Sequence, residues 1–231
     1  MRPIYYDTET TGIKAEVDRI VEIAAYDPVN GQTFEKLINP GIPIPKEVSR
    51  IHNISDEMVA DAPTFAELAD EFCTFCQGED VVLIAHNNDN FDIHFLKHEF
   101  IRAGREMPAW KTLDTLKWSR RYRPDLPRHT LQFLREIYGF PPNTAHRALD
   151  DVVILHKVFT CMTDDLPMET VYRLMTVERA ITHMPFGKHQ GKPLEEVPQE
   201  YIDWLAKGDA LTRPDNMGLK KQLATLGRIK V

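Results

Sequence analysis

Two carboxylates two positions apart follow a short apolar run near the start of the chain. Asp7 and Glu9 come after Ile4-Tyr5-Tyr6, which predicts a short strand. Because side chains alternate along a strand, both carboxylates are expected on the same face. They repel each other unless a cation lies between them, and their hard oxygen atoms suit Mg²⁺ or Mn²⁺. Taken alone, two acids so spaced at a strand end more often mark a solvated turn.

A third acidic residue, Asp92, follows a predicted buried strand and opens a predicted helix. The strand covers 81–85, and the intervening residues run from His86 to Phe91. Asp92 therefore lies near the carboxyl edge of a strand, where α/β folds place their ligands. The alternative is that Asp92 only caps the helix N-terminus.

A histidine and two further acids, His146, Asp150 and Asp151, form the third element. At about 100° per residue, five positions separate His146 from Asp151 by roughly 140° around a helix. The two side chains cannot share one face of a continuous helix, so we expect His146 in a loop or frayed first turn and Asp151 on the helix. Both could then reach one centre. Asp150 is a competing ligand, and a lone loop histidine is usually a surface residue.

The elements that must position these side chains alternate along the first two thirds of the chain. An opening meander of strands has turn residues at 27–31. Alternating strands and helices follow, which predicts an α/β three-layer domain with a mixed sheet. Strands are expected over 4–6, 19–26, 33–38, 81–85 and 111–116, and helices over 64–77, 92–103, 129–138 and 149–162.

Composition and charge limit the class of protein. The 231 residues are 42% hydrophobic and 27% charged, as in a soluble globular protein with a filled core. No apolar run approaches the roughly 20 residues that span a bilayer, and the start lacks the apolar region of a secretion signal. We therefore expect a cytoplasmic protein with no membrane partner. The net charge of −7 argues against a general polyanion binder.

The three acidic elements together resemble the three motifs of the DEDDh exonucleases, in the same order and over about residues 4 to 160. Each motif is weak alone, but three in order on the expected strands and helices make coincidence improbable. The resemblance implies a ribonuclease H-like fold and His146 as general base for the attacking water. It also implies two Mg²⁺ or Mn²⁺ ions per site, held by Asp7, Glu9, Asp92 and Asp151.

The same resemblance implies residues around the substrate. Ile13 resembles the apolar residue that wedges against the terminal base, and His52 belongs to the segment that borders the terminal nucleotide. Asn53 stands where the family usually has glycine. Asp114 resembles an acid that supports the site without binding metal. The remaining candidates for substrate contacts are Thr10, Thr11, Asn87 and Phe91.

The implied function is a metal-dependent 3′→5′ exonuclease that hydrolyses DNA from its 3′ end and releases nucleoside 5′-monophosphates. The motifs do not distinguish ribose from deoxyribose, so an RNA 3′ exonuclease on the same scaffold is an alternative. A second alternative is a nucleic-acid binding module with an inactive catalytic centre, and a third is a proofreading subunit of a replicative polymerase. A basic stretch is expected to guide the phosphate backbone, unless it is a solvated loop: Lys111, Lys117, Arg120, Arg121, Arg123 and Arg128.

The end of the chain differs from the rest. We expect the exonuclease domain over 1–165, a connecting helix over 166–182 and a small α+β module over 183–231 that contacts nucleic acid or a partner. A Met184-Pro-Phe-Gly-Lys-His-Gln-Gly-Lys-Pro motif resembles the module of bacterial exonuclease X-type proteins. Its glycines predict a hairpin that presents cations. Tyr201, Trp204 and Leu205 are expected mainly in the module core, with base stacking as the alternative.

Overall fold

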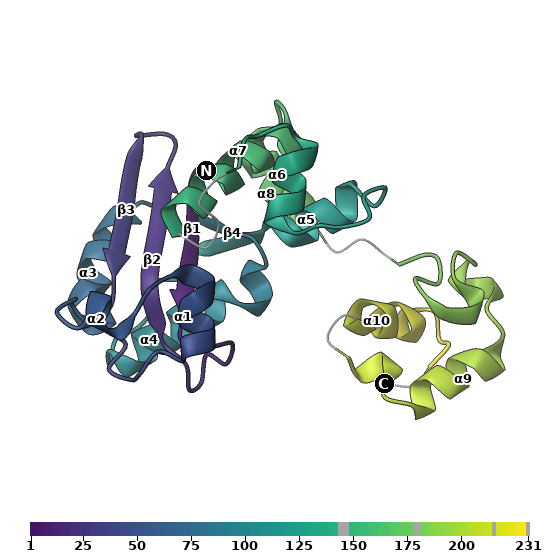
Figure 1. The fold of residues 1–231 in the computed structure, drawn as a ribbon. Helices are drawn as coiled ribbons and strands as arrows, with labels where there is room; N and C mark the ends of the chain where they lie inside the picture. The colour runs from purple at the N-terminus through teal and green to yellow at the C-terminus, as the bar shows by residue number, and fades with distance from the viewer. Residues whose placement is uncertain (143–147, 178–180, 214–215, 230–231) are drawn as a thin grey trace. The chain divides into compact units, whose positions relative to one another are not determined.

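The chain divides into two compact units, Met1–Met175 and Thr176–Val231. The computed structural model describes residues 1–142, 148–177, 181–213 and 216–229. The first unit contains a sheet and flanking helices, and the second is a small helical unit (Figure 1). Among the described residues, no helix combines the length and apolar character needed to cross a membrane.

A five-stranded mixed sheet in the order β3-β2-β1-β4-β5 forms the centre of the first unit. β1 pairs antiparallel with β2, and β2 antiparallel with β3, so the opening strands form the predicted meander. β1 pairs in parallel with β4, and β4 with β5. The prediction of an α/β domain with a mixed sheet is confirmed. The strands are β1 (Arg2–Thr10), β2 (Ile20–Asp27), β3 (Gln32–Leu37), β4 (Val81–Ala85) and β5 (Lys111–Asp114).

Helices cover both faces of this sheet. The structure contains each helix that the periodicity predicts in this unit, and three more between β3 and the loop before α6: α1, α2 and α5. The carboxylate of Asp114 accepts hydrogen bonds from the amides of Leu116 and Lys117, and this cap ends β5 two residues before the predicted strand end. The helices are α1 (Lys46–His52), α2 (Asp56–Val59), α3 (Phe65–Phe75), α4 (Asp92–Arg102), α5 (Thr115–Tyr122), α6 (Leu131–Ile137), α7 (Ala148–Thr163) and α8 (Met168–Thr176).

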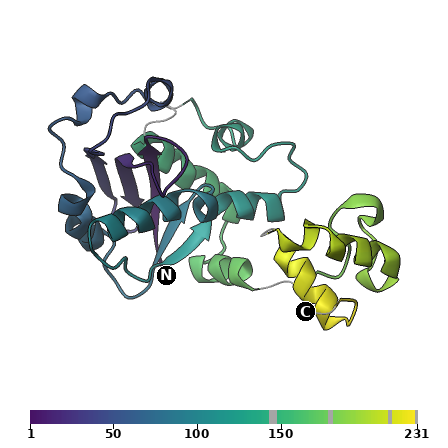
Figure 2. The ribbon, with the colours of Figure 1, turned by 90° about the horizontal axis from the view of Figure 1, so that it is seen from below.

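Alternating residues of β1 belong to two different apolar cores. Tyr6 packs in a cluster with Phe72 of α3 and other residues of α3 and α4. Tyr5 packs on the other face with Trp118 of α5 and Phe159 of α7. The period-two alternation of the strand therefore builds the three layers of helix, sheet and helix (Figure 1, Figure 2).

The second unit has its own core, which includes Met184, Ile202 and Leu205. Its described residues form helices and 3₁₀ turns rather than the expected strands. The predicted hairpin is observed as a tight loop, in which the Met184 amide donates to the Lys192 carbonyl at 2.8 Å around one isolated bridge. The elements are α9 (Gln199–Lys207), α10 (Met217–Thr225), η2 (Gly187–His189), η3 (Leu194–Glu196) and η4 (Ala210–Thr212).

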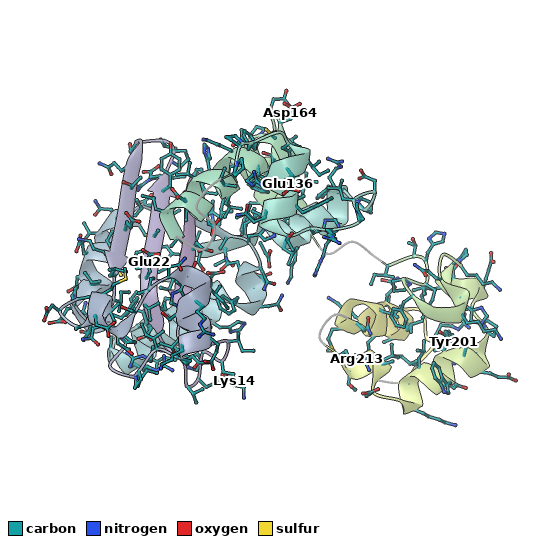
Figure 3. All side chains as sticks on the ribbon, viewed as in Figure 1. Lys14, Glu22, Glu136, Asp164, Tyr201 and Arg213 are labelled. Carbon is teal, nitrogen blue, oxygen red and sulfur yellow. The ribbon has the colours of Figure 1, made fainter. Side chains whose placement is uncertain are left out.

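The aromatic residues of α9 separate into core and surface. Leu205 is buried as expected, whereas the Trp204 side chain is 65% exposed. Tyr201, which Figure 3 labels, lies between them in exposure. Its ring stacks on that of Trp204, with 5.6 Å between the ring centroids. Gly187 has a φ of 75°, and a side chain there would collide with the Tyr201 hydroxyl. The expectation that Trp204 belongs to the core is not met in this structure.

Candidate active site

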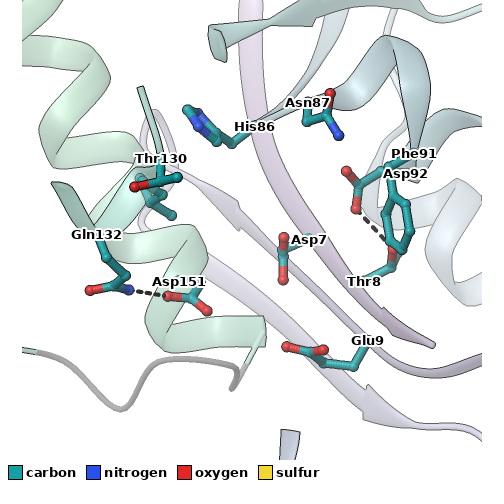
Figure 4. A pocket seen from close by; sticks show the side chains of 11 residues that line it. Asp7, Thr8, Glu9, His86, Asn87, Phe91, Asp92, Thr130, Gln132 and Asp151 are labelled. Atoms are coloured by element: carbon teal, nitrogen blue, oxygen red, sulfur yellow. Dashed lines mark hydrogen bonds between the residues drawn. The ribbon is translucent and has the colours of Figure 1, made fainter. Parts of the chain in front are cut away.

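β1 presents two carboxylates to one pocket. Asp7 and Glu9 project from the same side of the strand toward Asp151 of α7 (Figure 4). One carboxylate oxygen of each residue lies within 4.8 Å of the other two. A strand and a helix more than 140 positions apart in the sequence therefore bring three acids together.

Asp92, the first residue of α4, lines the same pocket. It is only 2% exposed, and Thr8 of β1 donates a hydrogen bond from Oγ1 to its Oδ1 at 2.8 Å (Figure 4). The pocket has a volume of about 290 Å³. It is lined by Asp7, Thr8, Glu9, His86, Asn87, Phe91, Asp92, Thr130, Leu131, Gln132 and Asp151.

Burial and mutual repulsion perturb these carboxyl groups. Burial raises the pKa of Asp7 well above its usual range, and the charges of Asp92, Glu9 and Asp151 raise it further. Burial also raises the pKa of Asp92 to about 7, although the Thr8 hydrogen bond opposes the shift. The charged form of both groups is therefore unfavourable without a compensating cation. Carboxylate oxygens are the ligands that Mg²⁺ and Mn²⁺ take, so this donor set fits such ions.

Two polar contacts hold α7 in place. Glu22 of β2, fully buried, accepts a hydrogen bond from the Ala148 amide at the start of the helix, with 3.0 Å between Oε2 and N. Gln132 of α6 donates from Nε2 to Asp151 Oδ1 at 3.1 Å. Asp150 is exposed and does not line the pocket. Of the two competing acids, the structure thus brings only Asp151 to the other carboxylates.

His146 lies outside the described residues, since 143–147 are among the positions that the structure leaves out. Its role therefore stays a prediction. A different histidine, His86, lines the pocket, but both of its ring nitrogens are engaged. Nδ1 lies 2.8 Å from Thr115 Oγ1, and Nε2 lies 2.8 Å from the carbonyl oxygen of His129. His86 thus joins the end of β4 to the loop before α6.

Asp114 supports the turn that carries Asp92. It is 2% exposed, and its carboxylate accepts hydrogen bonds from the amides of Asn87 at 3.1 Å and Asp89 at 3.2 Å. These bonds fix the 86–91 turn between β4 and α4. The position of Asp114 agrees with the predicted supporting role, since it does not line the pocket.

The candidate substrate residues fall into two groups. Asn87 and Phe91 line the pocket, and Ile13 is 81% exposed. Thr10, Thr11 and His52 are buried and do not line it. The Thr10 hydroxyl donates to the Gly12 carbonyl at 2.6 Å, and His52 Nδ1 accepts from the Ile54 amide at 3.1 Å. These three residues brace the neighbouring loops in this structure.

Sequence reasoning missed Gln132, Thr8 and Glu22 as parts of the site. A pattern signal existed for Thr8, which lies between the two acids of β1. Nothing in the sequence marked Gln132 or Glu22, because each contact joins distant segments. The predicted helix spacing could have separated Asp150 from Asp151, since Asp151 shares the buried face with Ala148 and Leu155.

A mixed five-stranded sheet with carboxylates converging beside β1 defines a ribonuclease H-like nuclease. A family model described as exonuclease matches residues 4–159, which is more than half of the chain. The chain belongs to this exonuclease family. The prediction of a 3′→5′ exonuclease, a phosphodiester hydrolase, is confirmed at this level.

Known proteins similar to this chain include two curated relatives and one solved structure. DNA polymerase III subunit epsilon of Treponema pallidum (strain Nichols) is 40% identical over 162 residues, covering 68% of this chain and 74% of the relative. Exonuclease DPD1 of Arabidopsis thaliana is 37% identical over 181 residues, covering 71% of this chain and 57% of the relative. The structure of exonuclease X with 5′ overhanging duplex DNA shares the fold, with a TM-score of 0.57 at 24% identity. The match covers 74% of this chain and 98% of that one.

The second unit matches a different family model. The match covers residues 174–231, and the family is described as a putative quorum-sensing-regulated virulence factor. That description names no chemistry, so the role of this unit must be argued from its own surface.

Proposed function

We propose that this protein removes nucleotides one at a time from the 3′ end of DNA, with two Mg²⁺ or Mn²⁺ ions held by Asp7, Glu9, Asp92 and Asp151. The observation that carries the proposal is the convergence of these acids from β1, α4 and α7 on one pocket. Burial raises the pKa of Asp7 and Asp92, and neighbouring carboxylates raise that of Asp7 further, so bound cations would stabilise the charged forms.

When bound, the ions would neutralise charge on the scissile phosphate and make water a better nucleophile near neutral pH. Thr8 holds the Asp92 carboxylate, and Gln132 holds that of Asp151. His146, by the family resemblance, accepts the proton of the attacking water. Water attacks the phosphorus of the last phosphodiester, and the bond to the 3′ oxygen of the shortened strand breaks. The product is a nucleoside 5′-monophosphate.

Three exposed or pocket-lining residues are proposed to bind the terminal nucleotide. Asn87 and Phe91 line the pocket beside Asp92. Ile13 is exposed on the loop after β1, which Arg19 braces through a bidentate pair with buried Glu99 at 2.7 and 2.9 Å. An exposed apolar side chain on a braced loop suits the proposed wedge against the terminal base.

DNA is proposed as the substrate because the relatives' names support it: a DNA polymerase subunit, and exonuclease X bound to duplex DNA. The test is to incubate the protein with 5′-labelled single-stranded DNA, duplex DNA or RNA in Mg²⁺. A ladder of one-nucleotide steps is expected on DNA, with slower degradation of RNA and no products in chelator.

Faster degradation of RNA than of DNA would show that the protein is an RNA 3′ exonuclease. Binding of labelled DNA without any release of mononucleotides would instead indicate a non-catalytic binding module. Release of long fragments would show internal cleavage and contradict the exonuclease assignment.

We propose further that the second unit contacts the nucleic-acid strand. Residues 183–231 hold eight Lys and Arg against six Asp and Glu, a net charge of +2, whereas the first 182 residues carry −9. Exposed Trp204 stacks on Tyr201, whose ring meets His189 edge-on at 4.7 Å. Such rings stack on bases irrespective of sequence.

Removing residues 183–231 is expected to weaken binding to long strands and leave short ones unaffected, because a second contact raises the local substrate concentration only for strands that reach it. The truncated protein should match the full chain on a trinucleotide and bind a 30-mer about 5- to 100-fold more weakly. Trp204→Ala in the full chain should reproduce part of this loss. Equal loss on both substrates would instead mean that the unit supports folding.

A further inference from the structure

A second pocket adjoins the candidate active site. It has a volume of about 500 Å³ and shares four lining residues with the first pocket: His86, Asn87, Thr130 and Leu131. A strand bound at the carboxylates therefore passes within reach of it. Its other lining residues are Leu116, Arg120, Pro127, Arg128 and His129. The lining contains no acidic residue.

The cations of this pocket differ from their neighbours in the basic stretch. Lys111 pairs with Asp80, Lys117 with Asp89, and Arg123 with Asp125. The charges of those three are thus matched within the protein.

Arg120 and Arg128 are exposed, and neither makes a hydrogen bond or ion pair with any residue that the structure describes. Arg121 lies over the Tyr122 ring at 5.5 Å and does not line the pocket, so it is not among the residues of the basic stretch that we assign to phosphate binding. Positive charge without an internal partner is therefore concentrated at Arg120 and Arg128.

The wall that joins the two pockets is held rigidly. Burial lowers the pKa of His86, so its ring is neutral, and Nε2–H donates to the His129 carbonyl while Nδ1 faces the Thr115 hydroxyl. Nδ1 of His129 in turn lies within hydrogen-bonding distance of Ser119 Oγ, at 2.7 Å. These bonds join the loop carrying Arg128 to α5, the helix that carries Arg120. The pocket is therefore formed before any ligand binds.

We propose that this second pocket binds an adjacent nucleotide of the strand being cut. Arg120 and Arg128 hold its phosphate, because a guanidinium matches two phosphate oxygens at once. Leu116, Pro127 and Leu131 supply apolar walls for its sugar and base. The proposal rests on the proposed function and extends it, since it makes the enzyme depend on a strand longer than the nucleotide being removed.

The test compares substrates that do and do not reach the second pocket. The p-nitrophenyl ester of thymidine 5′-monophosphate presents a single nucleotide to the carboxylates, whereas an oligothymidylate of ten residues fills both pockets. Arg120→Gln with Arg128→Gln is expected to raise KM for the oligonucleotide by roughly 10- to 100-fold, the usual worth of charged hydrogen bonds, with little change in kcat. For the ester, the double variant and the matched control, Arg121→Gln, should have the same kinetic constants.

A binding measurement gives an independent readout. In chelator, where the strand is not cut, the affinity of the double variant for the oligonucleotide should depend less on salt, by about one unit of slope per lost phosphate contact. The Arg121→Gln control should keep the wild-type slope.

Each other outcome overturns the proposal. Equal loss on ester and oligonucleotide would show that the arginines support the catalytic pocket, and an unchanged KM and salt slope would show that no phosphate binds there. With duplex DNA as a third substrate, a loss by the double variant on the duplex alone would assign the pocket to the complementary strand. Failure of the wild-type protein to hydrolyse either substrate would overturn the proposed function instead, so the two failures are distinguishable.

Discussion

Asp7→Asn is expected to lower the rate of mononucleotide release by at least about 10³-fold. Asp7 contributes one carboxylate oxygen to the cluster that it forms with Glu9 and Asp151. Charge stabilisation by metal is worth several kcal/mol in such reactions. Asparagine has nearly the same volume, so the fold is retained. Calorimetric titration with Mn²⁺ should show weaker binding in the variant.

Stability separates this effect from misfolding. Burial and neighbouring charges make the ionised form of Asp7 unfavourable, as its raised pKa shows. Without metal, the neutral amide should therefore leave the melting temperature equal to or above that of the wild type.

Asp150→Asn is the matched control, because Asp150 is exposed beside Asp151 and outside the pocket. It should keep full activity. An Asp7→Asn protein that retained both Mn²⁺ affinity and rate would remove Asp7 from the metal site.

His146→Ala is expected to lower the maximal rate by about 10²- to 10⁴-fold at neutral pH, the usual contribution of a general base. Metal affinity should stay near the wild-type value, since imidazole is not among the proposed ligands. The measurement is single-turnover hydrolysis at saturating Mg²⁺, together with calorimetric titration of the metal.

The pH dependence gives the more specific readout. An imidazole accepts a proton only when neutral, so the wild-type rate should fall as pH drops below roughly 6.5, the ordinary pKa of histidine. With Mg²⁺ saturating at every pH, so that protons do not displace metal from the carboxylates, His146→Ala and His146→Gln should both lose this acidic limb. Added imidazole should restore part of the rate in the alanine variant. If both variants keep the limb, a different group takes the proton.

The sequence by itself predicted the elements whose signals are local. Apolar runs and helical spacing marked every strand of the sheet, and α3, α4, α6 and α7, because burial of one face leaves a periodic pattern. The shared face of Asp7 and Glu9 followed from alternation alone. Asp92 at the start of α4 followed from the order of strand and helix.

Short helices escaped prediction for a physical reason. α1 and α2 each bury a single residue, His52 and Val59, so neither has a repeating apolar face. α5 depends on the Asp114 cap, which looks in sequence like the end of a strand.

Only the tertiary structure decided which of several similar residues reaches the site. Helical spacing places Asp151 rather than Asp150 on the buried face of α7, but only the packing of α7 on the sheet brings Asp151 to the other carboxylates. Gln132 reaches Asp151 only because α6 lies beside α7. The basic stretch shows the same limit: partners distant in sequence match Lys111 and Lys117, while Arg120 keeps its charge unmatched among the described residues. Contacts between distant segments depend on how layers pack, and local periodicity carries no record of that packing.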